Sequence, residues 1–295
     1  MDTGEDALMS HSANVDQMEA EDWAGELGEK WLANVDRFEG MIAPVGAGLM
    51  AHAAFQSGER VVDIGCGAGP TTLEIARAVG PSGEVLGIDI SPALIEECRR
   101  RAEAASIANA RFLVADAAGV KPEGAPFDRL FSRFGSMFFP NPKAAFANLR
   151  AILRPGGRAD LGVWAPPSEN QWVGALMGIV GRHVELPPPV PHAPGPFALD
   201  DPDYVRPILV SAGFESIDFK LWRGEQLVGG PGSTPDSAAE FVINALSIGD
   251  ALAEKPEEVR REVLTELTAL FAQHRAPDGI RMGATAWFIT AYAPA

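Results

Sequence analysis

Two periodicities of apolar residues alternate along the chain between residues 60 and 164. Short apolar runs rich in β-branched residues are typical of buried strands, and they lie at 60–65, 84–90, 110–116, 127–134 and 157–164. Between them, apolar residues recur at helical spacing in segments 70–80, 92–105 and 142–153. Strands separated by helices in this way predict parallel crossover units, with helices on both faces of one sheet.

The segments on either side of this alternation follow other patterns. Residues 23–55 are helical in pattern, with an apolar stripe that Pro44 is expected to interrupt. After Trp164, a helical stretch leads into the proline-rich "ELPPPVPHAPGPF", which suits neither a continuous helix nor a central strand. Two strand-like runs near 216–228 and 284–293 are joined by helices and predict an antiparallel pair at one sheet edge.

These patterns together predict an α/β fold. We expect a doubly wound, mostly parallel, Rossmann-like sheet of seven strands with an antiparallel edge strand, N-terminal helices and a cap of helices and proline-rich chain. The expected organisation is a flexible tail over 1–22 and a single domain over 23–295. Its cap, which includes the substrate-binding segment, covers about 165–280.

Composition narrows the possible partners and the compartment. The 24 basic and 40 acidic side chains give a formal net charge of −16, which repels a nucleic-acid backbone over most of the surface. Two cysteines are too few for a disulfide framework or a zinc site, and no apolar run reaches the roughly 18–20 residues that span a membrane. The N-terminus lacks a signal-peptide pattern. We therefore expect a cytoplasmic protein without nucleic-acid partners, membrane insertion or metal.

The segment "VVDIGCGAGP", residues 61–70, places a glycine-rich loop between the first strand and the next helix. Such a loop lets backbone N–H groups approach a ligand closely. A dinucleotide fingerprint requires glycine at the third position after Gly67, where this chain has Pro70, and a P-loop requires a lysine that is absent here. Asp63, two residues before the first glycine, would repel a pyrophosphate and attract an ammonium group, so a zwitterionic amino-acid ligand is favoured.

Two further acids end the next two strands. Asp89 can accept hydrogen bonds from the vicinal hydroxyls of a ribose, and Asp116 can accept one from the exocyclic amine of adenine. Amino acid, ribose and adenine in this order across three strand ends indicate S-adenosylmethionine. Each aspartate also has a structural interpretation as a cap of the following helix, most directly Asp89, which Ser91 and Pro92 follow.

In these motifs the chain resembles the class I S-adenosylmethionine-dependent methyltransferases and is similar to the ubiquinone and menaquinone biosynthesis type. The matching segments are 61–69, 85–91, 112–118, 127–139 and 149–164. The resemblance implies cofactor contacts at Asp63, Gly65, Cys66, Gly67, Asp89, Ile90, Asp116, Ala117, Ser132 and Arg133. For Cys66 a small loop residue is favoured over a nucleophile, because no base is placed beside it.

The acceptor is expected to enter where the N-terminal helices, the loop after the fourth strand and the cap converge. The candidate side chains there are mostly apolar, with two histidines: Trp31, Phe134, Met137, Phe138, Trp172, His183 and His192. For the histidines a structural or solvated role is the alternative, and for the tryptophans it is packing in the core.

The predicted function is methyl transfer from S-adenosylmethionine to a hydrophobic or aromatic small molecule, at oxygen or carbon. A sulfonium methyl is already electrophilic, so alignment and exclusion of water are the main requirements, and no fixed catalytic residue is assigned. Two alternatives are an NAD(P)-dependent dehydrogenase on the same fold and a non-catalytic nucleoside-binding subunit. A homodimer is possible.

Overall fold

The computed structural model describes residues 20–186 and 188–295. Its strands are β1 (Arg60–Ile64), β2 (Glu84–Asp89), β3 (Ala110–Val114), β4 (Phe127–Arg133), β5 (Leu153–Trp164), β6 (Glu215–Val228), β7 (Arg275–Ala276) and β8 (Gly279–Tyr292). Its α-helices are α1 (Ala20–Ala24), α2 (Glu26–Ala33), α3 (Val35–Ala53), α4 (Pro70–Val79), α5 (Pro92–Ala104), α6 (Pro142–Ala151), α7 (Gln171–Val180), α8 (Pro202–Ser211), α9 (Pro235–Ala245) and α10 (Glu257–Gln273). Short 3₁₀ helices are η1 (Gly135–Phe138), η2 (Pro167–Glu169) and η3 (Ser247–Leu252). Most of the predicted tail, 1–22, lies outside the described residues, and α1 begins at Ala20.

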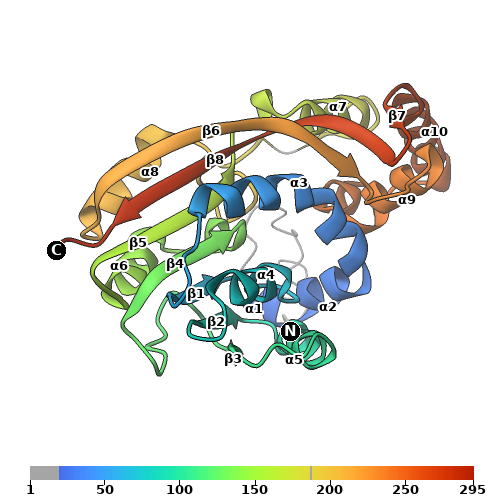
Figure 1. The fold of residues 1–295 in the computed structure, drawn as a ribbon. Coiled ribbons are helices and arrows are strands. Elements are labelled where there is room, and N and C mark those ends of the chain that lie inside the picture. The colour runs from blue at the N-terminus through green and yellow to red at the C-terminus, as the bar shows by residue number, and fades with distance from the viewer. Residues whose placement is uncertain (1–19, 187) are drawn as a thin grey trace, which may run out of the picture.

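One mixed sheet forms the centre of the fold, with strand order β3-β2-β1-β4-β5-β8-β6 (Figure 1). The path through the sheet has the predicted seven strands, and the two-residue β7 pairs with β8 outside that path. Strands β1 to β5 pair in parallel, whereas β8 is antiparallel to both of its neighbours. The predicted mostly parallel sheet with an antiparallel edge is therefore confirmed, and the reversed strand is β8, which lies between β5 and β6.

The strand order creates a switch point between β1 and β4. From β1 the chain adds β2 and β3 on one side, and later adds β4 and β5 on the other. Because crossover connections are right-handed, helices α4 and α5 cover one face and the helices that follow β4 and β5 cover the opposite face. The loops after β1 and β4 therefore diverge, and ligands of such folds bind in the crevice between them.

Helix α3 crosses the sheet on the face that it shares with α4, against β5, β6 and β8 (Figure 1). The expected interruption at Pro44 does not occur, because α3 continues through that residue. An internal proline costs about 3 kcal/mol, and the burial of Phe38, Met41, Val45 and Leu49 from the same helix offsets that cost.

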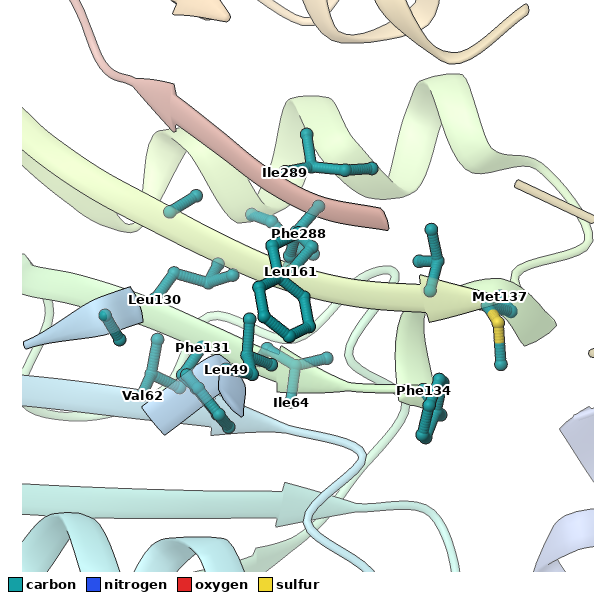
Figure 2. Packing of buried hydrophobic residues seen from close by; sticks show 14 of the residues in the cluster. Leu49, Val62, Ile64, Leu130, Phe131, Phe134, Met137, Leu161, Phe288 and Ile289 are labelled. Carbon is teal, nitrogen blue, oxygen red and sulfur yellow. The ribbon is translucent and has the colours of Figure 1, made fainter. Parts of the chain in front are cut away.

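A continuous apolar core fills the space between α3 and the strands. Figure 2 shows Leu49 of α3 with Phe131 of β4 and Phe288 of β8, which the strand register places on the face of the sheet that α3 covers. Phe134 and Met137 lie at the carboxyl ends of the strands, apart from the centre of this cluster (Figure 2). The core therefore reaches the edge of the sheet where the switch point opens.

A buried ionic network around Arg129 of β4 and Asp160 of β5 lies between the end of α3 and the sheet. Asp160 is 0% exposed and accepts hydrogen bonds from Arg129 (2.7 Å), Arg158 (2.5 Å) and the Thr290 hydroxyl (3.2 Å). Arg129 also pairs with Glu59 at 3.0 Å. Every charge in the network has a partner, which is the condition under which buried ions are tolerated.

Replacing Asp160 should strongly destabilise the fold. Asp160→Ala leaves the buried guanidinium of Arg129 with Glu59 alone and the half-buried Arg158 without a carboxylate, which should lower the free energy of unfolding by about 3–5 kcal/mol. Urea denaturation followed by circular dichroism measures this change. The matched control is Asp218→Ala on the exposed side of β6, expected within about 0.5 kcal/mol of the wild type. Equal stability of both variants would contradict the prediction.

Candidate functional site

A cavity opens at the carboxyl ends of β1, β2, β3 and β4. Its polar side is lined by residues 65–68 after β1, Asp89 and Ile90 at β2, residues 115–117 after β3, and Arg133 at the end of β4. These four loops come from strands that are neighbours in the sheet. The cavity therefore occupies the crevice that the switch point predicts.

The glycine loop is held in a conformation that other residues would strain. Gly65, Gly67 and Gly69 have φ of 65°, 58° and 85°, in the left-handed region. A Cβ on Gly65 would lie 2.6 Å from the Cα of Gly135, so the loops after β1 and β4 touch there. The glycines bring bare backbone to the cavity surface, and this leaves room for a ligand.

Asp89 joins the glycine loop to the end of β2. Its Oδ2 accepts a hydrogen bond from the N–H of Gly67 (2.8 Å), and its Oδ1 accepts one from the N–H of Ser91 (3.0 Å). The side-chain cap of α5 is Ser91, whose Oγ accepts from the N–H of Leu94 (3.4 Å). Asp89 therefore does not cap that helix. A carboxylate has about four acceptor positions, so two remain for a ligand.

Asp116, Ala117 and Ile90 lie together at the next part of the cavity. Oδ1 of Asp116 accepts a hydrogen bond from the N–H of Ala118 (2.8 Å), and this fixes the turn after β3. The N–H of Ala115 donates to the backbone oxygen of Asp89 (3.0 Å), so the loops after β2 and β3 are tied to each other.

Asp63 lies beneath the glycine loop and does not line the cavity. It is 0% exposed, and its Oδ2 accepts hydrogen bonds from the hydroxyls of Thr71 and Thr72, both 2.7 Å. Its Oδ1 has no partner among the described residues. Burial raises the Asp63 pKa to about 6, although the two hydroxyls and the charge of Arg133 oppose that shift. A direct contact with a ligand ammonium stays a prediction.

Ser132 supports the site from behind. It is buried, its Oγ donates to the backbone oxygen of Ile64 (2.9 Å), and the same atom accepts from the N–H of Ser136 (3.1 Å). These bonds fix the loop after β4 against the end of β1. Ser132 therefore does not line the cavity, whereas the neighbouring Arg133 does.

Cys66 packs against Cys98 under the loop. Both thiols approach the backbone oxygen of Gly67, from 3.8 Å and 3.1 Å. The hydrogen bond with Cys98, together with burial, raises the pKa of the Cys66 thiol well above its usual range. A thiol that resists ionisation is a poor nucleophile, which supports the structural interpretation of Cys66.

Two aromatic groups form the apolar side of the cavity. In the first, Trp31 stacks on Phe38 (4.2 Å between ring centroids, 4° between planes), and Trp23 meets Trp31 edge to face. In the second, Phe134 stacks on Trp164 (4.2 Å, 20°), and Trp172 lies 5.8 Å from Trp164. The remaining apolar lining residues are Met41, Ile42, Met137, Phe138, Phe139, Pro140, Pro196 and Leu246.

Comparison with known proteins assigns the domain. Residues 61–157 match the family model described as a methyltransferase domain. Over 115 residues, the chain is 37% identical to the aklanonic acid methyltransferase DauC of Streptomyces sp. strain C5, a match that covers 39% of this chain and 52% of that enzyme. Residues 61–157 therefore form a methyltransferase domain. The chain spans about half the length of this relative.

Other relatives extend the similarity to more of the chain. The nocamycin O-methyltransferase of Saccharothrix syringae is 27% identical over 202 residues, 63% of this chain and 72% of that enzyme. Phosphoethanolamine N-methyltransferase 2 of Haemonchus contortus, solved in complex with S-adenosyl-L-methionine, has a TM-score of 0.56 at 17% identity and covers 94% of this chain and 60% of its own. This structural likeness shows the shared fold, and in that relative the bound molecule is S-adenosyl-L-methionine.

The residues of this methyltransferase domain fit that cofactor. Backbone of Gly65 and Gly67 lines the cavity, Asp89 has acceptor positions left, and Arg133 presents N–H donors at the glycine-loop end of the cavity. Eight of the ten predicted cofactor residues line the cavity: Gly65, Cys66, Gly67, Asp89, Ile90, Asp116, Ala117 and Arg133.

The residues predicted to contact the acceptor also fall into two groups, those that line the cavity and those that do not. Trp31, Phe134, Met137, Phe138 and Trp172 line the cavity, whereas the two histidines do not. His183 lies beyond α7, with its Nε2 2.9 Å from Glu266 of α10. His192 stacks on Tyr204 at 3.6 Å, because the proline-rich segment folds its ring toward α8. Neither histidine lines this cavity, and a contact of either one with an acceptor stays a prediction.

Several lining residues were not among the predicted site residues. Phe38, Met41 and Ile42 continue the apolar stripe of the N-terminal helices, and this stripe was the signal that marked them. Glu39 also lines the cavity, and its carboxylate pairs with Arg101 of α5 at 2.8 Å. Burial raises its pKa, and Arg101 opposes that shift. Leu246 carries no sequence signal, because its place follows from how α9 ends beside the cavity.

Asp63 should make stability fall as pH rises from about 4 to 6. Burial raises the pKa of Asp63 in the folded chain to about 6 from its ordinary value of 3.8, so in this range the folded chain holds a proton that the unfolded chain has released. The stability that the proton on Asp63 provides is lost as pH rises through about 6, where the folded carboxyl ionises, and little further change is expected above that pH. Urea unfolding of wild type and Asp63→Asn between pH 4 and 7.5 tests this. The wild type should lose stability relative to the variant over that range, and a constant difference would contradict the prediction.

Asp89→Ala should remove cofactor binding without unfolding the chain. The substitution deletes the acceptor positions left for a ribose. We therefore expect the affinity for S-adenosylhomocysteine to fall at least about 100-fold. Isothermal titration calorimetry measures this affinity, and circular dichroism checks the fold. Glu103→Ala, on the exposed side of α5, is the matched control and should bind as the wild type does. Near-native affinity of Asp89→Ala would show the ribose assignment to be wrong.

Proposed function

We propose that this protein transfers a methyl group from S-adenosylmethionine to a hydrophobic or aromatic small molecule, at oxygen or carbon. One observation carries the proposal: a single cavity joins the loops after β1, β2 and β3 to the aromatic groups around Trp31 and Trp164. The first half suits an amino-acid nucleoside, and the second suits a flat apolar acceptor.

Each cofactor contact follows from a side chain or backbone group in the cavity. The backbone at Gly65, Cys66 and Gly67 would approach the methionine part, and Asp89 would accept from the ribose hydroxyls. Ile90 would pack on the adenine ring. The exocyclic amine of the adenine would donate a hydrogen bond to Asp116, and the backbone of Ala117 would lie beside it. The bound cofactor supplies an electrophilic sulfonium methyl group.

The protein would contribute to the reaction by aligning the acceptor with the methyl group and by excluding water. Aromatic side chains on two sides of the cavity hold a flat acceptor in a limited set of orientations, and they exclude water that would compete for hydrogen bonds. A general base is needed only for an acceptor that is still protonated. We therefore assign no catalytic residue.

The named relatives support an aromatic or polyketide-like acceptor, since one acts on aklanonic acid and another is a nocamycin O-methyltransferase. A dehydrogenase is not favoured, because the matched family is a methyltransferase domain and Pro70 begins α4 where a dinucleotide fingerprint requires glycine. Homodimer formation and a cytoplasmic location stay predictions. No helix of the described residues has the length and apolarity needed to cross a bilayer.

Two measurements test the proposal. S-adenosylhomocysteine at about 100 times its Kd should raise the melting temperature by about 5–10 °C, whereas NADH should leave it unchanged. Purified protein with methyl-labelled S-adenosylmethionine and a small-molecule extract should then yield a labelled apolar product, identified by mass spectrometry. A shift with NADH alone would favour the dehydrogenase. Cofactor binding without any labelled product would favour the non-catalytic subunit.

A further inference from the structure

Arg133 is a cation without a partner on the wall of the cavity. It is the last residue of β4 and lines the cavity together with apolar side chains. Its guanidinium makes no hydrogen bond or ion pair with any described residue. The side chain is half-buried, so its N–H donors are only partly hydrated, and an anionic ligand that enters the cavity would satisfy them.

Arg129, on the same face of β4, shows that this strand can place a fully paired arginine. Its guanidinium donates to Asp160 (2.7 Å), Glu59 (3.0 Å) and the backbone oxygen of Ala53 (2.6 Å). Side chains two and four residues apart on a strand share a face, so both arginines point toward α3. Only the one at the carboxyl end of the strand is left with its donors free.

Three acids act on Arg133 through their charge, Asp63 first and then Glu39 and Glu74, and Asp63 shares its face of the sheet. In the parallel register Asp63 pairs with Phe131, so its side chain leaves the sheet on the face of Phe131 and Arg133. The charge of each group favours the ionised form of the other, although burial dominates the pKa of both. Two threonine hydroxyls hold Oδ2 of Asp63, and Oδ1 has no partner. The carboxylate is thus fixed beneath the loop, on the same face of the sheet as Arg133, and acts on the guanidinium through its charge.

Gly46 of α3 makes room for the guanidinium. A Cβ at that position would lie 2.8 Å from Nη1 and 3.2 Å from Cδ of Arg133. An alanine there would displace the side chain from its place, although alanine is the better helix former. The helix therefore gives up some intrinsic stability at the point where it faces the cation.

The position of Arg133 identifies the part of the ligand that it meets. The loops after β1 and β4 touch at Gly65 and Gly135, so Arg133 lies at the glycine-loop end of the cavity, away from Asp116. An amino-acid nucleoside places its amino-acid part at this end. Its carboxylate is an anion that matches the planar donors of arginine.

We propose that Arg133 binds the α-carboxylate of the methionine part of the cofactor, and that Asp63 is a positioning residue that acts through Arg133. This inference rests on the proposed use of S-adenosylmethionine. It is an alternative to the prediction that Asp63 meets the ammonium group directly, and the Asp63→Asn experiment below distinguishes the two. Gly46 completes the subsite as the residue that lets the guanidinium reach its place.

Two nucleosides that differ only in the carboxylate test the subsite. Calorimetry would compare S-adenosylhomocysteine with its decarboxylated analogue, S-adenosyl-3-thiopropylamine. The wild type should prefer the carboxylate form about 10- to 100-fold. Arg133→Met should abolish that preference and leave the affinity for the analogue unchanged, and Arg133→Lys should restore part of it.

A second variant perturbs the subsite without touching the charge. Gly46→Ala should reduce the preference in the same direction, because the added Cβ displaces the guanidinium. The matched control is Gly174→Ala in α7, where a Cβ would meet nothing within 4 Å, and the preference should stay at the wild-type value. Thermal unfolding confirms that each variant is folded.

The Asp63→Asn variant separates the two roles of that residue. A carboxylate that positions Arg133 should affect S-adenosylhomocysteine alone, whereas one that meets the ammonium would affect both nucleosides, since both retain the amine. Equal weakening of both, or a preference that survives Arg133→Met, would overturn the inference and leave the proposed function intact. Failure of the wild type to bind either nucleoside would overturn both.

Discussion

Right-handed crossover connections are the constraint from which the site follows. They oblige α4 and α5 to cover one face of the sheet and the helices after β4 and β5 to cover the other, so the crossover helices leave a crevice between the ends of β1 and β4. The two loops that leave this point touch at Gly65 and Gly135. Side chains of the N-terminal helices, among them Trp31 and Phe38, line the cavity that lies in this crevice.

The cofactor loops depend on one another more than on their own strands. Asp89 accepts from the N–H of Gly67, the N–H of Gly65 donates to the backbone oxygen of Ile88, and the N–H of Ala115 donates to that of Asp89. Three strand ends therefore form one hydrogen-bonded rim. A change at any of them shifts the others, because the polar groups of a buried rim have no water to substitute for a lost partner.

The sequence was sufficient for the elements and the cofactor loops, because local signals encode them. Strand periodicity and the glycines set β1 and its loop, and the acids at 89 and 116 stand at strand ends where the topology brings them together. The positions of His183 and His192 could not be predicted from the sequence, because they depend on how the chain around the proline-rich segment folds; the ring of His192, for example, stacks on Tyr204 of α8. The continuity of α3 through Pro44 was also hidden, because packing against three strands outweighs a local preference.

Arg129 and Arg133 show why residue type alone does not decide the role of a buried charge. Both stand on one face of β4, four residues apart, and both are shielded from bulk water by α3. The register of β5 brings Asp160 to Arg129, and the chain before β1 adds Glu59, so that charge is satisfied within the fold. At the carboxyl end of β4, the charge of Asp63 acts on Arg133 without an ion pair, because the Asp63 carboxylate is hydrogen-bonded to Thr71 and Thr72. The difference in partners, set by strand register, makes one arginine part of the core and leaves the other to bind a ligand.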